Sequence, residues 1–208
     1  MSRSRVERDR ASDNAVDGHG ARERILAAAT RLFQESGYEG TSVSRIAKAA
    51  DMTPANMYWH FPSKQEVLAE VLSSMYRRSY EELASAVPAG GAVERLSAYV
   101  RAYVRIQLTE VGEHRNFGYA SLASALPPEG QDEVNRVGRP YLELLREILR
   151  QGVAEGEFEI DDLKVTSYAI STTCEYVFTW CRADGPLPFD EVGENYVRLI
   201  LRMVRRTR

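Results

Sequence analysis

Apolar side chains recur every three or four residues from Ala21 almost to the end of the chain, and this spacing constrains the fold more than any other feature. Positions three and four residues apart lie on one face of an α-helix, which can then be buried against neighbouring helices. In no stretch do apolar and polar residues alternate for long enough to predict a β-strand. The sequence therefore predicts an all-α protein.

Glycine, proline and helix-capping residues divide this pattern into about nine helices. Gly37 ends the first of them and Pro62 ends the third. Residues 1–19 are polar and lack apolar periodicity, so we expect a disordered arm there. The rest is divided into a head, residues 20–65, and a body, residues 66–208. The expected helices cover residues 21–36, 43–50, 54–60, 63–86, 92–109, 113–125, 129–154, 161–183 and 189–205.

Two short helices in the head are separated by a tight break at Asp51-Met52. Thr41 or Ser42 can cap the first helix and Thr53 the second, because a side-chain hydroxyl accepts a hydrogen bond from a free N–H of the first turn. Pro54 follows at the first helical position, where its missing N–H is harmless. Two short helices with such a turn are typical of a helix-turn-helix, which places its second helix in the major groove of DNA.

The second helix would enter the groove N-terminus first, where free N–H groups and the positive end of the helix dipole favour contact with DNA. Asn56 is the strongest candidate for a base contact, since an amide can form two hydrogen bonds with adenine. The residues expected near base edges are Thr53, Pro54, Ala55 and Asn56. Those expected nearer the sugar-phosphate backbone are Thr41, Ser42, Arg45, Tyr58, Trp59, His60 and Lys64. Alternatives stay open: the two aromatic residues can belong to the core, the two threonines can act only as caps, and the arginine can be a solvated surface residue.

Charge and composition restrict the class of protein further. The formal net charge is −3, but residues 1–64 carry ten Lys or Arg against eight Asp or Glu, and the remainder seventeen against twenty-two. A mildly basic N-terminal part permits DNA binding there. The sequence has no glycine-rich phosphate loop, nucleophile elbow or metal-spaced His/Cys/Glu set, so we expect neither an enzyme nor a metal or cofactor site. Without a long apolar run or a secretory signal, we expect a cytoplasmic protein that does not contact membranes.

The head resembles the N-terminal part of TetR-family transcriptional regulators. The likeness extends over about 45 residues without a gap, and its most specific part is the pattern Tyr-x-His-Phe-x-x-Lys at residues 58–64. It implies an all-helical fold with a three-helix DNA-binding head and a C-terminal body that binds a ligand and dimerises. The family often has glycine where this chain has Asp51 and Ala55. Aspartate tolerates the left-handed conformation, so we expect the turn to be kept. The segments that carry the resemblance are Arg22-Glu23-Arg24-Ile25-Leu26-Ala27-Ala28-Ala29, Gly37-Tyr38-Glu39-Gly40-Thr41-Ser42-Val43, Ile46-Ala47-Lys48-Ala49-Ala50 and Met57-Tyr58-Trp59-His60-Phe61-Pro62-Ser63-Lys64-Gln65-Glu66-Val67-Leu68.

By this resemblance, the last two helices pair with those of a second copy to form a four-helix dimer interface. The candidate apolar contacts are Val177, Phe178, Tyr196, Leu199, Ile200 and Met203. A ligand would lie among the middle helices, in a largely apolar pocket with a few polar groups. The candidate lining residues are Tyr103, Gln107, Phe117, Tyr119, Tyr141, Tyr168, Thr172 and Tyr176. Each candidate in both sets can instead be an ordinary core residue.

A second resemblance concerns residues 178–187, which are similar to the corresponding segment of TetR-like regulators of fatty-acid or sterol catabolism. Trp180 and Arg182 carry this likeness, and several of those regulators respond to acyl-CoA thioesters. The two resemblances imply a repressor that binds a palindromic operator as a homodimer and is released by a small hydrophobic effector, with an acyl-CoA as one candidate. An aromatic or drug-like effector, and control by a protein partner, are the alternatives.

Overall fold

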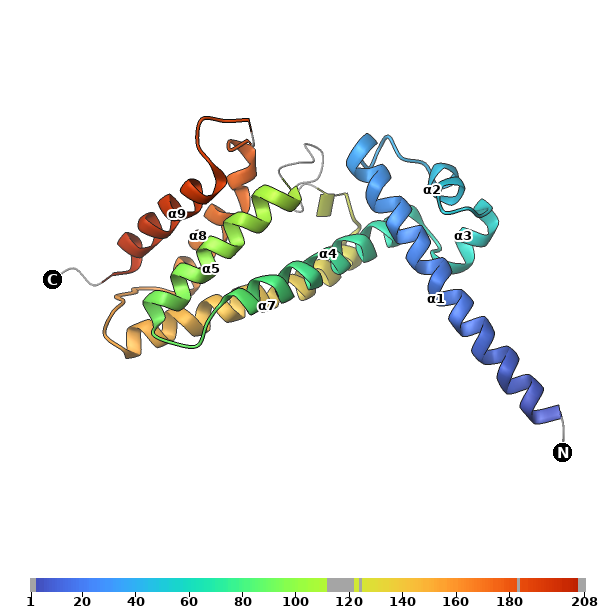
Figure 1. Ribbon diagram of the computed structural model, residues 1–208, viewed down its shortest axis with the longest axis horizontal. Coiled ribbons are helices and arrows are strands. Elements are labelled where there is room, and N and C mark those ends of the chain that lie inside the picture. Colours follow the sequence, from blue (N-terminus) through green and yellow to red (C-terminus); the bar gives the residue numbers. More distant parts are fainter. Residues whose placement is uncertain (1–2, 112–121, 124, 183, 206–208) are drawn as a thin grey trace. The chain divides into compact units, whose positions relative to one another are not determined.

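The computed structural model describes residues 3–111, 122–123, 125–182 and 184–205 (Figure 1). This part of the chain contains eight α-helices, a π-helix and a 3-10 helix, and its β-type pairing is one isolated bridge between Phe158 and Arg205. The predicted all-α fold is confirmed. The helix expected over 113–125 lies almost wholly outside the described residues. The α-helices are α1 (Arg3–Ser36), α2 (Val43–Ala49), α3 (Pro54–His60), α4 (Lys64–Ala86), α5 (Ala92–Ile106), α7 (Pro128–Ala154), α8 (Leu163–Glu175) and α9 (Phe189–Val204).

Helix α1 begins at Arg3, well before the expected start at Ala21. Its first half thus occupies residues 3–19, for which we expected a disordered arm. That segment contains no proline that would break a helix, and it has no apolar stripe.

Two other helices end earlier than expected. Helix α5 ends at Ile106 and is followed by a π-helix, η1 (Gln107–Val111). Helix α8 ends at Glu175, not near residue 183, and is followed by a 3-10 helix, η2 (Tyr176–Thr179). The residues of η2 are all aromatic or β-branched, and such side chains lose rotational freedom in an α-helix. This preference explains the tightened end of α8.

The described residues form two compact units. The head unit contains residues up to 72 together with a segment that ends at 133, and the body unit contains the remainder. Helix α4 contributes to both units. Its first turns carry Val67, Leu68 and Leu72, which are fully buried. These turns explain why the head unit extends past the boundary expected near residue 65.

In the head unit, α2 and α3 pack beside the C-terminal half of α1 (Figure 1). Ile25, Phe33, Ile46 and Met57 are all inaccessible to solvent and form the centre of this unit. Gly37 has φ +71°, a conformation that costs glycine little and ends α1 as predicted. The three-helix head therefore has one small core. Helix α3 contributes Met57 to this core, and the opposite face of α3 points away from it.

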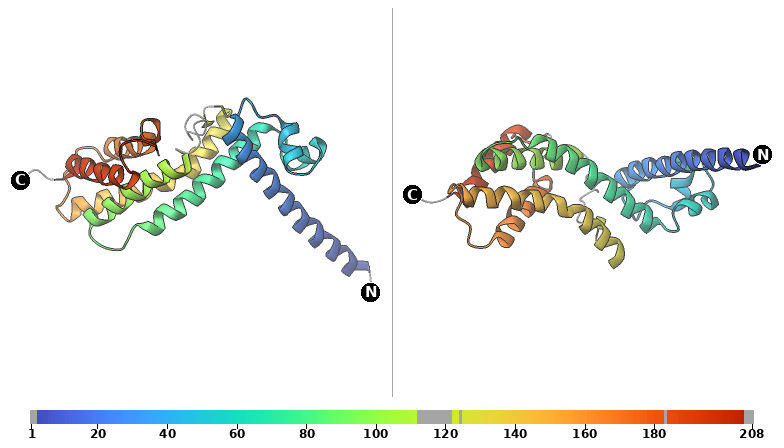
Figure 2. Two further views of the ribbon diagram at one scale, coloured as in Figure 1. Left: turned by 45° about the horizontal axis from the view of Figure 1, so that its top comes forward. Right: turned by 90° about the horizontal axis from the view of Figure 1, so that it is seen from below.

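In the body unit, α5 packs along α9 and also contacts α8 (Figures 1 and 2). Its core includes Leu96, Val100, Leu145 and Ile200, which are fully buried. At the C-terminal end of α7, the ring of Phe158 packs so closely on Gly152 that a Cβ there would lie 2.0 Å from a ring carbon. A larger residue at that position would force the Phe158 ring to shift.

Candidate DNA-binding surface

The turn between α2 and α3 keeps a tight geometry although its residue is not glycine. Asp51 has φ +57°, in the left-handed region that aspartate tolerates. The backbone N–H of Met52 donates to the Ala47 carbonyl at 3.0 Å, which closes the turn. The expectation that the turn survives the replacement of glycine is confirmed.

Helix α3 is positioned by its N-terminal cap and by one buried side chain. Thr53 Oγ1 accepts a hydrogen bond from the backbone N–H of Asn56 at 3.2 Å, and Pro54 occupies the first turn as predicted. Met57 is fully buried and attaches the helix to the core. The cap uses the hydroxyl of Thr53, while the amide side chain of Asn56 is exposed.

The face of α3 opposite Met57 lies open to solvent. Pro54 and Ala55 are exposed, Tyr58 is 50% exposed and Trp59 is 88% exposed. The alternative that the two aromatic residues belong to the core of this chain is therefore wrong. Large exposed aromatic side chains beside a capped helix N-terminus are typical of a surface that binds a partner.

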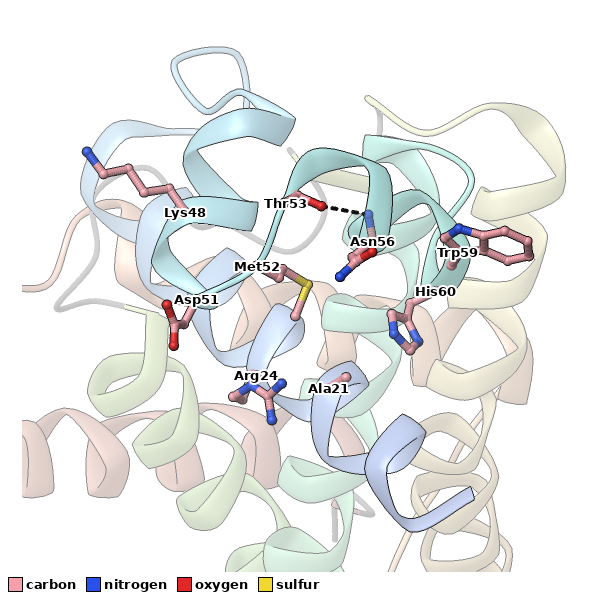
Figure 3. A pocket seen from close by; sticks show the side chains of 9 residues that line it. All are labelled: Ala21, Arg24, Lys48, Asp51, Met52, Thr53, Asn56, Trp59 and His60. Atoms are coloured by element: carbon pink, nitrogen blue, oxygen red, sulfur yellow. Dashed lines mark hydrogen bonds between the residues drawn. The ribbon is translucent and has the colours of Figure 1, made fainter. Parts of the chain in front are cut away.

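A surface depression of about 740 Å³ lies against the turn and the exposed face of α3 (Figure 3). It brings together four residues that the sequence predicted as DNA contacts: Thr53, Asn56, Trp59 and His60. Its other lining residues are Ala21, Arg24, Lys48, Asp51 and Met52. Because α1, α2 and α3 all contribute, the depression depends on the tertiary structure of the head.

Two cations in this depression, Arg24 and Lys48, were missed by the sequence analysis. Both are exposed, and neither forms an ion pair within the part of the chain that the structure describes. The periodicity of α2 could have identified Lys48, which lies between the buried residues Ala47 and Ala50 on the helix surface. Arg24 belongs to a separate helix, so its place beside α3 required the fold.

Two of the residues predicted to contact the DNA backbone, Thr41 and Lys64, form hydrogen bonds within the head. Thr41 is buried, and its hydroxyl donates to the carbonyls of Gly37 (2.8 Å) and Leu32 (3.1 Å). Lys64 Nζ donates to the carbonyls of Tyr38 (2.9 Å) and Thr41 (3.2 Å), and lies 3.9 Å from the Tyr38 ring centroid. The assignment of Thr41 is corrected because this residue is buried. Lys64 is half-buried and stabilises the connection between α1 and α2, and its contact with the sugar-phosphate backbone stays a prediction.

Ser42 and Arg45 occupy the N-terminal end of α2. Ser42 is the cap residue, and its Oγ accepts a hydrogen bond from the backbone N–H of Arg45 at 3.3 Å. The exposed guanidinium of Arg45 donates to the Gly40 carbonyl (2.7 Å) and to Ser36 Oγ (3.1 Å). Arg45 thus also orders the loop before α2, which leaves Lys48 as the less constrained cation of this helix.

Of the predicted effector-binding residues, three lie at the centre of the body unit. Tyr103, Gln107 and Tyr141 are buried, and the ring centroids of the two tyrosines are 5.5 Å apart. Burial, and to a smaller extent the charge of Glu175, hold the pKa of Tyr103 well above its ordinary value. Gln107 Oε1 has no hydrogen-bond partner among the described residues. Buried aromatic rings beside an unpaired amide oxygen suit the recognition of a largely apolar molecule with one polar group.

The other predicted effector residues are not found there. Tyr168, Thr172 and Tyr176 are exposed, because α8 turns Ser167, Ile170 and Ser171 toward the core instead. These three residues are not part of the buried group, and their role as effector contacts stays a prediction; Tyr168 and Thr172 line a separate surface depression of about 690 Å³ along α8. Phe117 and Tyr119 lie outside the described residues.

The predicted dimer contacts divide in the same way. Val177 and Ile200 are fully buried within their own chain, so they have no surface to offer a second copy, and their assignment is corrected. Phe178 and Tyr196 are half-buried. We define the outer apolar surface as the exposed apolar side chains of α8, η2 and α9, together with Trp180, which directly follows η2. Its largest members are Val165, Tyr168, Tyr176, Trp180, Leu199 and Met203.

Comparison with known families identifies the class of protein. Residues 25–71 match the family described as "Bacterial regulatory proteins, tetR family", and residues 89–204 match "Tetracyclin repressor-like, C-terminal domain". The chain belongs to the TetR family. It is a helix-turn-helix transcriptional regulator, and curated relatives such as the KstR2 repressors are regulators, not enzymes.

Several proteins are similar to this TetR-family chain over most of its length. The HTH-type transcriptional repressor KstR2 of Mycolicibacterium smegmatis is 28% identical over 189 residues, which cover 86% of this chain and 88% of that protein. A TetR/AcrR-family regulator from Thermobifida fusca is 31% identical, with a TM-score of 0.72 and coverage of 89% and 98%. AibR, solved with isovaleryl coenzyme A and operator DNA, has a TM-score of 0.71 and 24% identity, with coverage of 86% and 97%. That last likeness is one of fold.

Two further observations concern the described residues alone. None of their helices combines the length and apolar character needed to cross a membrane. Their His, Cys, Asp and Glu side chains form no group of three that could hold a metal ion.

Proposed function

We propose that this TetR-family regulator is a repressor that binds a palindromic operator as a homodimer and dissociates when a small hydrophobic effector binds its body unit. The observation that carries the DNA-binding part is the exposed N-terminal face of α3 beside a depression with two exposed cations, Arg24 and Lys48, that form no ion pair within the described residues. Asn56 would contact an adenine in the major groove, since it is exposed one turn from the helix start. Lys48 and Arg24 would contact phosphates on either side.

The outer apolar surface supports the dimer. Trp180 is 55% exposed and stacks on Tyr196, with ring centroids 6.3 Å apart, so this part of the surface is already ordered. Leu199 and Met203 continue the surface along α9 at helical spacing. A twofold axis through such a surface would bury it in both copies at once. The dimer would place two recognition helices roughly 34–36 Å apart, to meet successive major grooves.

Three considerations support an effector that binds the body unit. Tyr103 and Tyr141 are buried, and Gln107, one helical turn after Tyr103, has an amide oxygen that lacks a partner among the described residues. KstR2 is named as a repressor, and AibR shows that this fold can bind both a CoA thioester and DNA. Residues 178–187 resemble regulators of fatty-acid or sterol catabolism, although Trp180 itself lies on the outer apolar surface. An acyl-CoA thioester is therefore the effector class to test first.

Release of the dimer from the operator follows from a ligand-induced shift between two conformations of the protein. A ligand that binds better to a conformation unable to engage both half-sites shifts the dimer away from the operator. Affinity for DNA then falls by at most the factor by which the ligand prefers that conformation.

The test combines DNA selection with ligand screening. The purified protein selects duplexes from a random-sequence library, and the enriched duplex is titrated with acyl-CoA thioesters of varied chain length, free CoA and hydrophobic aromatic compounds. A thioester that raises the melting temperature and weakens binding to the duplex supports the proposal. Shifts with aromatic compounds alone indicate a different effector class, and no shift with any compound favours control by a protein partner. An effector that tightens DNA binding would contradict the proposed sign of regulation.

A further inference from the structure

Arg22 holds three parts of the head unit together. From α1, its Nη1 donates to the His60 carbonyl at 3.1 Å, and its Nη2 donates to Glu70 Oε2 at 3.3 Å. Its guanidinium carbon lies 4.1 Å from the centroid of the Phe61 ring. His60 is the last residue of α3, and Glu70 lies in the second turn of α4. One side chain thus links the end of α3 to two much longer helices.

The chemistry of this contact suits arginine in particular. The last carbonyls of a helix have no partner within the helix and carry partial negative charge, which a cation stabilises. A planar guanidinium can donate in two directions while its face packs on an aromatic ring. Lysine has a single charged nitrogen and cannot make all three contacts of Arg22 in the same way.

The end of α3 that Arg22 holds controls the position of the other end. A helix of seven residues is about 10 Å long, so a tilt of roughly 10° displaces its far end by about 2 Å. Hydrogen bonds to bases tolerate only a few tenths of an ångström. So short a helix is not stable alone, and its direction depends on Met57 and on the contacts at its two ends.

We propose that Arg22 is a positioning residue for operator recognition, which fixes the direction of α3 with Glu70 as its support and does not itself contact DNA. This inference rests on the proposed role of α3 in contacting bases. It separates Arg22 from Arg24, which lines the depression as an exposed cation. Loss of Arg22 therefore lowers affinity for the specific sequence and leaves the general attraction to DNA nearly unchanged.

The first test uses Arg22→Lys, which keeps the positive charge. The probes are the duplex that the unmodified protein enriches from a random library and a scrambled duplex of the same composition. Dissociation constants are measured over a range of salt concentrations, at a temperature where circular dichroism shows every variant fully folded. Binding to the enriched duplex should weaken by at least about tenfold, roughly the cost of one lost base contact. Binding to the scrambled duplex should change by less than about twofold, with an unchanged salt dependence.

Glu70→Gln is a sharper test, because simple electrostatics predicts the opposite sign. Removal of a negative charge near DNA should strengthen binding, whereas the positioning role predicts weaker binding to the enriched duplex, by about threefold or more. Glu66→Gln is the matched control. Glu66 is exposed one turn earlier on α4, so its replacement removes the same charge without changing the contacts of Arg22, and binding should stay equal or tighten.

Two results would overturn the positioning role. Equal losses on both duplexes would make Arg22 a direct phosphate contact whose geometry lysine does not reproduce. Unchanged affinity of folded Arg22→Lys and Glu70→Gln for the enriched duplex would leave the side chain with a purely stabilising role. If the unmodified protein enriches no sequence at all, the proposed function itself is contradicted and the positioning role is lost with it.

Discussion

The head unit and the body unit differ in how far apart in the sequence their proposed functional residues lie. In the head, the residues proposed to contact bases are consecutive, from Thr53 to Asn56, and a local capping rule places them at an exposed helix start. In the body, the residues proposed to bind an effector come from α5, η1 and α7, so they meet only after separate helices have packed. A function built from neighbours in the sequence can be predicted locally, whereas a pocket cannot.

The largest expected effect tests the head. Asn56→Ala should weaken binding to the enriched duplex by at least about thirtyfold, since a dimer loses two base contacts of roughly 1–3 kcal/mol each. The melting temperature should stay the same, because the Asn56 side chain is exposed and the cap uses only its backbone N–H. Electrophoretic mobility shift and thermal unfolding measure the two quantities. Asn135→Ala, an exposed asparagine of α7, is the control; full affinity of Asn56→Ala would contradict the assignment of base contacts.

The next effect concerns the packing of the body. Gly152→Ala should lower the free energy of unfolding by about 1–3 kcal/mol, since the new Cβ would meet the Phe158 ring far inside contact distance. Gly138→Ala is the control on the same helix, where the nearest atom of Tyr76 is 3.7 Å from the new Cβ and alanine favours helix. Urea unfolding of both variants measures the difference. A Gly152→Ala variant as stable as the Gly138→Ala variant would show that Phe158 moves aside freely.

A smaller effect tests the cation that sequence reasoning missed. Lys48→Ala should weaken binding to enriched and scrambled duplexes alike, and the slope of log affinity against log salt should fall by about two per dimer. Arg150→Ala removes an exposed cation from the body and should change neither quantity. A loss confined to the enriched duplex would instead give Lys48 a base contact.

The smallest expected effect is a pH-dependent change in the body. Burial raises the pKa of the Glu175 carboxyl, so the folded chain holds that proton more tightly than the unfolded chain. Stability is therefore lost as the pH rises through the raised pKa, and Glu175→Gln should melt at a higher temperature than the unmodified protein at pH 7. The difference should disappear below the ordinary carboxyl pKa of about 4.3. Glu143→Gln, exposed on α7, should show no such pattern, and a Glu175→Gln variant that melts lower at pH 7 would contradict the argument.

Residue spacing predicted the head in some detail because its decisive features are local. The caps at Ser42 and Thr53, the turn at Asp51 and the glycine end of α1 each depend on one or two neighbouring residues. Polar contacts within the head were not predicted. Thr41 donates to carbonyls four and nine residues earlier, and Lys64 donates to carbonyls 23 and 26 residues earlier; a polar side chain gives no sign in the sequence of which partner it finds.

The body was harder to predict for a geometric reason. The sequence identified an apolar, aromatic segment near 161–183, but it did not fix which side of α8 faces the core. Tyr168 and Thr172 were assigned inward and lie outward, while Ser167 and Ser171 are buried. Helices usually bury apolar residues and expose polar ones, and α8 and the residue after it do the opposite at these positions. Periodicity alone therefore assigned the wrong face of α8 to the core.

The central claim, that α3 meets the bases of an operator, is tested most directly by cutting DNA from a known point on this helix. A cleavage reagent attached to Ala55→Cys reacts selectively, because Cys174 and Cys181 are buried. With the enriched duplex, we expect two cleavage centres in the major groove, about one helical turn apart. The same reagent on Asn135→Cys should leave the duplex intact. Cleavage outside the enriched sequence, or none at all from Ala55→Cys while the protein stays bound, would contradict the claim.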